Sequence, residues 1–220
     1  MELVVGSTNP SKVRQLTAAL LDAGVRVIPA DGSVLPTVPE EAGDVVGNAL
    51  AKAAAFAVAL RNNCLAMDAG LSFPDLERDV QPGPNVRRLP GARVPPDDDD
   101  LLAYYTDLCD RHGGRIRACW TYGFAIATTD LRQFADRASL ERTMVSPPSR
   151  LRHPGYPLDS LLLDPLTGRY LAEFTGAEEE QMWQATIGRP LAAFVRRTVE
   201  ALRDCSLRYS STPVDQEDAP

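Results

Sequence analysis

The chain has 220 residues, of which 23 are Lys or Arg and 30 are Asp or Glu, so its formal charge is −7. This length fits one large domain or a domain with an added lobe, and the acidic balance argues against a nonspecific nucleic-acid binder. No apolar stretch approaches the length of a membrane span and the N-terminus lacks the regions of a signal peptide, so we expect a cytoplasmic protein.

Strands and helices alternate in the first half of the chain. The predicted elements are strand 2–6, a helix starting near residue 12, strand 25–28, helix 44–60, strand 65–68 and helix 97–111. Asp44 is a suitable N-cap for the second helix, because its carboxylate can accept hydrogen bonds from unpaired N–H groups. The aspartate run at 97–100 is interpreted as a solvated helix start that complements the helix dipole, rather than a metal site.

The second half reads mainly as strands separated by turns. The predicted elements are strands 116–128, 140–145, 160–163 and 170–174, followed by helix 191–203. We therefore predict one two-lobed domain over 1–205 and a disordered acidic tail over 206–220. The fold class is α/β, an elongated curved mixed sheet flanked by helices that form two lobes with a central cleft.

The opening loop, residues 6–12, has the composition of an anion site. Asn9 is a good N-cap, Pro10 suits the first helical position, and Lys12 falls in the first turn, where a cation is normally disfavoured. An anion held between Lys12 and the helix N–H groups would remove that conflict. The alternative is a well-capped surface helix with a solvated lysine.

Several other residues are candidates for chemistry. Asp68 follows an apolar strand, where α/β proteins place ligand groups, or else it caps a turn with Gly70. Asp159 is a similar candidate. The pair Arg87-Arg88 is either a phosphate clamp or part of a solvated loop, and His153, in a turn, is a weak ligand candidate.

Six short motifs, taken in order, resemble the inosine triphosphate pyrophosphatases, which act on noncanonical purine nucleotides. The motifs are Thr8 to Arg14, Glu41-Ala42-Gly43 with Asn48 to Ala53, Asp68 to Leu71, Pro82-Gly83 with Arg88 and Gly91, Gly155 to Asp159, and Gly188-Arg189. The resemblance implies a homodimer that uses Mg²⁺ to release pyrophosphate from a nucleoside triphosphate. From charge and hydropathy we expect no nucleic-acid or membrane partner.

The resemblance also assigns roles to individual residues. Triphosphate contacts are implied for Ser7, Thr8, Asn9 and Lys12, and Arg88 is expected to face the nucleotide. Asp68 is expected to bind Mg²⁺ or activate water, with Lys12 beside it in the catalytic set. The base is expected to meet Tyr156 by stacking, the acidic neighbour Asp159, and Arg189.

The chain departs from the family pattern around the metal and the base. The expected metal-binding glutamate is Gly47, the first aspartate of the pair is Met67, and the serine after Asp68 is Ala69. The expected lysine is replaced by Gln181 or has no counterpart, and Gly188 stands in place of a histidine. Asp44, Glu40 or Glu41 are candidate substitute carboxylates. Two function classes therefore stay open, an active pyrophosphatase with altered base preference and a noncatalytic nucleotide-binding or regulatory protein. A different phosphate-ester hydrolase is a third, generic possibility.

Overall fold

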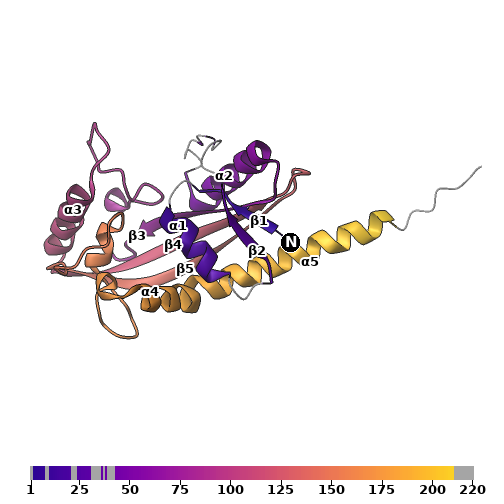
Figure 1. Ribbon diagram of the computed structural model, residues 1–220. Coiled ribbons are helices and arrows are strands. Elements are labelled where there is room, and N and C mark those ends of the chain that lie inside the picture. The colour runs from indigo at the N-terminus through magenta and orange to yellow at the C-terminus, as the bar shows by residue number, and fades with distance from the viewer. Residues whose placement is uncertain are drawn as a thin grey trace, which may run out of the picture.

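A six-stranded mixed sheet forms the centre of the computed structural model, which describes residues 2–7, 10–20, 24–30, 36, 38 and 43–210. The strands are β1 (Glu2–Val5), β2 (Arg26–Pro29), β3 (Cys64–Ser72), β4 (Arg115–Ala127), β5 (Gln133–Val145) and β6 (Leu162–Leu163), in the order β2-β1-β3-β4-β5-β6. β1 pairs in parallel with β2 and β3, whereas the pairs from β3 to β6 are antiparallel. Figure 1 shows the long strands β4 and β5 curving between helices, which confirms the predicted α/β class.

Five α-helices flank the sheet in the described part of the chain. They are α1 (Pro10–Ala19), α2 (Val45–Leu60), α3 (Asp98–Arg111), α4 (Gly176–Trp183) and α5 (Arg189–Ser210), with one π-helical turn, Gln184–Gly188, between the last two. Short 3₁₀ turns lie at Arg78–Val80, Pro157–Ser160 and Leu171–Glu173. Asp44 accepts hydrogen bonds from the first N–H groups of α2, and Asp97 caps α3 through a reciprocal bond with Asp100. Both predicted helix starts are therefore confirmed.

The first lobe has a core on each face of the sheet, because neighbouring strand residues point to opposite sides. Leu65 and Met67 pack on the side covered by α1 and α5, together with Leu16 and Phe194. The alternate residues of β3 pack on the other side, against the alanine-rich surface of α2. This alternation places the side chain of Asp68 on the α2 side of the sheet.

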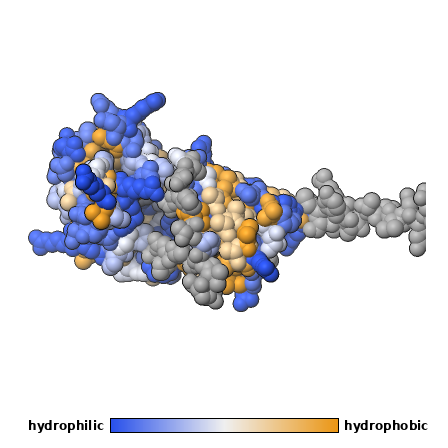
Figure 2. Space-filling model, turned by 90° about the horizontal axis from the view of Figure 1, so that it is seen from above, coloured by the Kyte–Doolittle hydropathy of each residue, from blue (hydrophilic) through white to orange (hydrophobic). Residues whose placement is uncertain are grey.

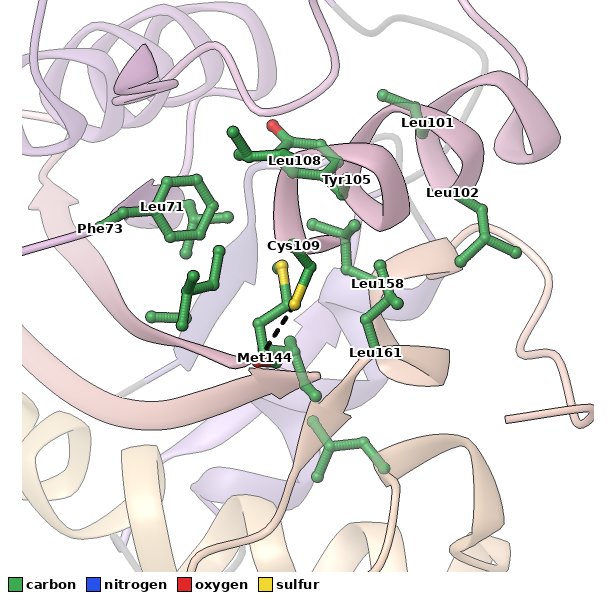
Figure 3. Packing of buried hydrophobic residues seen from close by; sticks show 14 of the residues in the cluster. Leu71, Phe73, Leu101, Leu102, Tyr105, Leu108, Cys109, Met144, Leu158 and Leu161 are labelled. Atoms are coloured by element: carbon green, nitrogen blue, oxygen red, sulfur yellow. Dashed lines mark hydrogen bonds between the residues drawn. The ribbon is translucent and has the colours of Figure 1, made fainter. Parts of the chain in front are cut away.

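A separate core forms the second lobe. Figure 3 shows its buried side chains, where Tyr105 and Leu108 of α3 pack against the ends of β3 and β5 and against the 3₁₀ turn at Pro157–Ser160. The thiol of Cys109 donates to the carbonyl oxygen of Met144 over 3.5 Å, which joins α3 to β5. The long hairpin of β4 and β5 thus carries two separately packed lobes, as predicted.

The surface of α2 is apolar, and Lys52 is the only charged residue in this helix. Figure 2 looks down on α2 and shows hydrophobic colour over it and hydrophilic colour over the lobe that carries α3. No helix in the described part of the chain is long and apolar enough to cross a membrane. Lys52 does not join the exposed surface, because 87 % of its side chain is covered.

Several predicted element boundaries are wrong. β3 continues four residues past Asp68 to Ser72 because every residue from Cys64 onward pairs with β4. The predicted strand at 170–174 is a 3₁₀ turn, and its pairing with a described strand is a single bridge between Leu163 and Tyr170. The unpredicted helix α4 follows it, and α5 runs to Ser210, past the predicted end at 203. Residues 211–220 of the predicted tail lie outside the described residues.

Candidate functional site

Asp68 lies in the middle of β3, opposite Gly123 of β4, and not at the end of a strand. Gly70, which follows it, is also part of the strand, so the turn expected there is wrong. Only 3 % of Asp68 is exposed. A carboxylate buried in the middle of a sheet requires compensating hydrogen-bond donors, because desolvation of a lone charge is costly.

Two glycines let α2 approach the sheet closely enough to supply such donors. A Cβ on Gly123 would lie 2.4 Å from the carbonyl oxygen of Val45, and one on Gly70 would lie 2.9 Å from the Val45 side chain. The N-terminal turn of α2 therefore rests directly on the sheet. One and two turns further along the helix, Asn48 and Lys52 project over Asp68, since residues four apart share a helix face.

Three side chains donate to Asp68. Lys52 Nζ lies 2.8 Å from Oδ1, Asn48 Nδ2 lies 3.0 Å from Oδ2, and Lys12 Nζ lies 3.5 Å from Oδ1. The two ammonium groups and one carboxylate leave a local charge of +1. Such a cluster attracts an anion, because an ammonium group forms charge-assisted hydrogen bonds with phosphate oxygens.

The two lysines of this cluster are the only lysines in the sequence, which has twenty-one arginines. An ammonium group is a compact charge that can share one carboxylate oxygen with a second ammonium group, whereas guanidinium is planar and larger. The sequence reasoning identified Lys12 but assigned no role to Asn48 or Lys52. Their i, i+4 spacing, with one polar and one charged side chain in an otherwise apolar helix, was the available signal.

The end of β1 and the start of α1 form the wall beside this cluster. Gly6 and Ser7 follow β1, and Lys12 lies in the first turn of α1, as the opening-loop prediction requires. The Lys12 side chain is 24 % exposed, so part of it faces the space between the lobes. Thr8 and Asn9 lie outside the described residues, and their assigned contacts stay predictions.

A cavity of about 760 Å³ separates the lobes, and the Asp68 cluster lies on its floor. This volume is in the range of small-molecule sites. The first lobe contributes Ser7, Lys12, Lys52, Phe56 and Asp68 to the lining, and the second contributes Arg87, Arg88, Tyr105, Tyr156 and Asp159. The predicted cleft is therefore present, with cations and aromatic side chains together.

Arg87 and Arg88, which line the cavity from the second lobe, differ in their contacts. Arg87 donates to Asp98 over 2.8 Å and to the carbonyl oxygen of Gly155 over 3.2 Å, and Asp98 accepts from the N–H of Gly155. These bonds fasten the loop that carries Tyr156 to the start of α3. Arg88, the arginine selected from the sequence, is exposed and lines the cavity.

Asp159, which the second lobe contributes to the cavity, pairs with His153. His153 Nδ1 and Asp159 Oδ2 are 3.0 Å apart. Burial raises the pKa of the Asp159 carboxyl, and the hydrogen bond to His153 opposes this. The same bond raises the pKa of the His153 imidazole against the effect of burial.

Two predicted site residues lie outside the cavity lining. Asp44 is exposed, and its Oδ1 accepts from the N–H groups of Val46 and Gly47 over 2.9 and 3.0 Å, so its role is that of a helix cap. Arg189 is exposed at the start of α5. The contact assigned to it therefore has no support in the position of its side chain.

The donors around Asp68 do not fit a magnesium site held by the protein. Both carboxylate oxygens already accept from cationic or amide groups, and Mg²⁺ prefers carboxylate, carbonyl and water oxygens. No group of three His, Cys, Asp or Glu side chains that could hold a metal ion occurs in the described part of the chain. Glu40 and Glu41 lie outside that part.

Comparison with known proteins settles the family. The model of the Ham1 family matches residues 3–185. The chain belongs to the Ham1 family. Comparison with curated proteins gave no match.

Solved structures agree with this membership. A nucleoside-triphosphatase / dITP/XTP pyrophosphatase from Mycobacterium abscessus is 26% identical with a TM-score of 0.63, over 88% of this chain and 98% of that one. A HAM1 protein from Coxiella burnetii is 22% identical with a TM-score of 0.70, over 90% and 99%. The Staphylococcus aureus Ham1 protein is 20% identical with a TM-score of 0.68, over 91% and 99%. The last two proteins, at 22% and 20% identity, show that the fold of this chain is the same as theirs.

The departures predicted from the sequence have clear positions in this Ham1 family member. Met67 is 3 % exposed and points away from Asp68, into the core beneath α1 and α5. Gly47 lies in the first turn of α2, where its N–H is capped by Asp44. Gly188 is buried in the π-helical turn, 3.3 Å from the carbonyl oxygen of Ala19 when a Cβ is added. Met67 and Gly188 thus contribute to packing, and the backbone of Gly47 to the capped start of α2.

Proposed function

We propose that this chain hydrolyses a noncanonical purine nucleoside triphosphate to the monophosphate and pyrophosphate. The observation that carries the proposal is the convergence of Lys12 and Lys52 on Asp68 at the floor of the cavity between the lobes. Ham1 family membership and the likeness to the Mycobacterium abscessus dITP/XTP pyrophosphatase support the reaction class.

The phosphate end of the cavity supplies charge and orientation. Lys12 and Lys52 bind phosphate oxygens, with Ser7 beside them and Arg88 on the opposite lobe. Water attacks the α-phosphorus and releases its proton to solvent, the bond from that phosphorus to the α–β bridging oxygen breaks, and pyrophosphate leaves with this oxygen. The ammonium groups of Lys12 and Lys52 stabilise the negative charge that develops on the phosphate oxygens and the bridging oxygen. Asp68 fixes both ammonium groups and orients the attacking water.

The other end of the cavity suits a base. Tyr156 offers an aromatic face for stacking, and Asp159 offers a carboxylate that can accept from a ring N–H. A purine with a lactam N–H, as in inosine or xanthosine, presents that donor. The cavity thus combines cations for the phosphates with an aromatic face and a carboxylate for the base.

Two further expectations from the resemblance remain part of the proposal. Mg²⁺ enters as a complex with the nucleotide, since Mg²⁺ is commonly held through substrate phosphates and the described side chains around Asp68 do not hold it. A homodimer is also expected, and light scattering coupled to size exclusion would measure its mass.

The test is a release assay for pyrophosphate and orthophosphate over a panel of nucleoside triphosphates, with and without Mg²⁺. We expect pyrophosphate as the product. Lys12→Met should weaken triphosphate binding at least about ten-fold while nucleoside binding is kept, because only phosphate oxygens lose a charged donor. Asp68→Asn should keep binding within a few-fold and lose most turnover.

The control for the lysine variant is Arg196→Gln, which removes one positive charge from an exposed position on α5 outside the cavity lining. It should bind and turn over nucleotides like the parent protein. Orthophosphate as the only product would rule out the proposed reaction. If Lys12→Met binds triphosphate like the parent, the phosphate end has been misplaced.

A noncatalytic nucleotide-binding protein is the second candidate. It is favoured by the saturation of Asp68, whose two oxygens are both engaged by side chains of the chain itself. Nucleotide binding with no product from any nucleotide would establish this alternative.

A further inference from the structure

We propose that His153 is a positioning residue that sets the charge of Asp159, so that base preference in this cavity changes with pH. The inference rests on the proposed function, because it takes a nucleotide base as the occupant of this end of the cavity. Neither Ham1 membership nor the similar structures assign a role to His153. The chain has only one other histidine, His112.

The geometry of one short loop holds the pair. The N–H of Tyr156 donates to the carbonyl oxygen of His153 over 2.9 Å, and the N–H of Asp159 donates to the carbonyl oxygen of Tyr156 over 3.1 Å. A turn followed by a 3₁₀ turn therefore brings residue 159 back beside residue 153. The bonds from Asp98 and Arg87 to Gly155 fix this loop to α3.

The pair lies at the wall of the cavity and is neither fully buried nor free in solvent. His153 is 24% exposed and Asp159 is 20% exposed, and Asp159 lines the cavity. His153 engages only one carboxylate oxygen, Oδ2. A carboxylate has two oxygens, so Asp159 retains acceptor capacity for a ligand on the cavity side.

The charged and titratable groups that face the pair come from three other elements. Glu179 of α4 faces both members, Arg142 of β5 faces Asp159, and Tyr122 of β4 faces Asp159 from the sheet. Arg142 is already paired with the buried Asp164 over 3.4 Å. His153 is therefore the group beside Asp159 that can gain a positive charge near neutral pH and so balance the charge of the carboxylate.

The protonation state of Asp159 decides which base edge it accepts. As a carboxylate it accepts from the lactam N–H of an inosine-type base, whereas the corresponding nitrogen of adenine is an acceptor and faces it unfavourably. When Asp159 is protonated this difference is lost. Because burial raises the pKa of Asp159, the loss occurs at a higher pH than for an exposed aspartate.

His153 shifts that transition in a defined direction. The protonated imidazole favours the charged carboxylate and so lowers the pKa of Asp159 against the effect of burial. In His153→Gln this opposition is removed while an amide of similar reach remains. The pKa of Asp159 should rise further, and the lactam preference should be lost at a higher pH than in the parent protein.

The experiment measures binding of inosine and adenosine monophosphates by calorimetry across pH 5 to 8. Monophosphates are not hydrolysed, so the measurement does not depend on turnover. For the parent we expect inosine preferred by about ten-fold at the high end, falling towards equality as pH is lowered. Asp159→Asn should show no pH-dependent preference. His112→Gln, at the remote C-cap of α3, should match the parent.

The informative result is the position of the transition in His153→Gln. A transition at higher pH than in the parent supports the proposal, and an unchanged transition overturns it. Loss of pyrophosphate release with an intact pH-dependent preference would reject the proposed reaction and keep the role of His153. Turnover with a preference that does not vary with pH would do the reverse.

A second measurement needs no ligand and no His153 variant. Proton NMR of the imidazole Cε1–H signals, assigned with His112→Gln, follows the titration of His153 in the intact protein. We expect the pKa of His153 to lie above its ordinary value, because of the hydrogen bond to Asp159, and to fall in Asp159→Asn. A titration of His153 that Asp159→Asn leaves unchanged would overturn the proposal.

Discussion

Lys52→Met should destabilise the fold more than Lys12→Met, although both remove one ammonium group from the same carboxylate. Breaking a buried ion pair by removing one partner costs about 3–5 kcal/mol when nothing else compensates the remaining charge. After loss of Lys52, the Asp68 carboxylate still accepts from Asn48 at 3.0 Å and Lys12 at 3.5 Å. We therefore expect a loss of about 2 kcal/mol in the free energy of unfolding.

The matched variant is Lys12→Met, which has the same change in charge and length. Lys12 Nζ lies farther from Asp68 Oδ1 than Lys52 Nζ does, at 3.5 Å against 2.8 Å, and its side chain is 24% exposed against 13% for Lys52. A partly solvated pair of this kind contributes about 0.5 kcal/mol. Urea unfolding followed by circular dichroism measures both variants, without nucleotide or phosphate in the buffer.

A double-mutant cycle then isolates the pair. Lys52→Met combined with Asp68→Asn removes both charges, so the coupling of Lys52 to Asp68 should be about 1–2 kcal/mol. The reasoning is refuted if Lys12→Met is the more destabilising variant, or if Lys52→Met unfolds at the same urea concentration as the parent.

The remaining predictions concern the support of the site and one exposed ion pair. Gly123→Ala should lower the free energy of unfolding by more than about 2 kcal/mol and weaken phosphate binding, because the new Cβ would meet the backbone of Val45. Urea unfolding would measure the first effect and calorimetry the second. Asp44→Ser should keep the stability of the parent and the Mg²⁺ dependence of its turnover, because serine also caps a helix. Asp44→Ala should lose about 1 kcal/mol of stability in thermal unfolding. Loss of the Mg²⁺ dependence in Asp44→Ser would restore Asp44 as a metal ligand. Glu178, whose hydrogen bond from Arg169 lowers its pKa from 4.5 to about 2, contributes stability above pH 4.5 that is lost as pH falls towards 2. Glu178→Gln should abolish this part of the acid dependence, and an unchanged acid midpoint would contradict it.

Local patterns were enough to predict much of the fold. The helix over 44–60 was predicted from apolar spacing and its Asp44 cap, and the helix over 97–111 from its acidic start, since both signals are contained in a few adjacent residues. Strand 65–68 was predicted too short, because Asp68 breaks an apolar run. Its burial depends on donors from α1 and α2, which no local pattern reveals.

The failures at the C-terminal side have the same cause. Tyr170, Leu171 and Phe174 have strand-forming side chains, but β6 offers them only one bridge, so the backbone turns into a 3₁₀ helix. The predicted site was partly correct in position: Ser7, Lys12, Asp68, Arg88, Tyr156 and Asp159 all line the cavity. Asn48 and Lys52 were missed, because their function depends on how closely α2 approaches the sheet.

The close approach of α2 to the sheet depends on the absence of side chains at Gly70 and Gly123. It brings Lys52 to the same carboxylate that Lys12 binds. The two lysines that meet at Asp68 are the only side-chain primary amines in the sequence. Reagents selective for amines usually modify many positions on a protein surface, but here they can reach only this cavity and the chain terminus. Reductive methylation with ¹³C-formaldehyde would therefore place two isotopic reporters at the proposed phosphate end, and their signals would follow its occupancy directly.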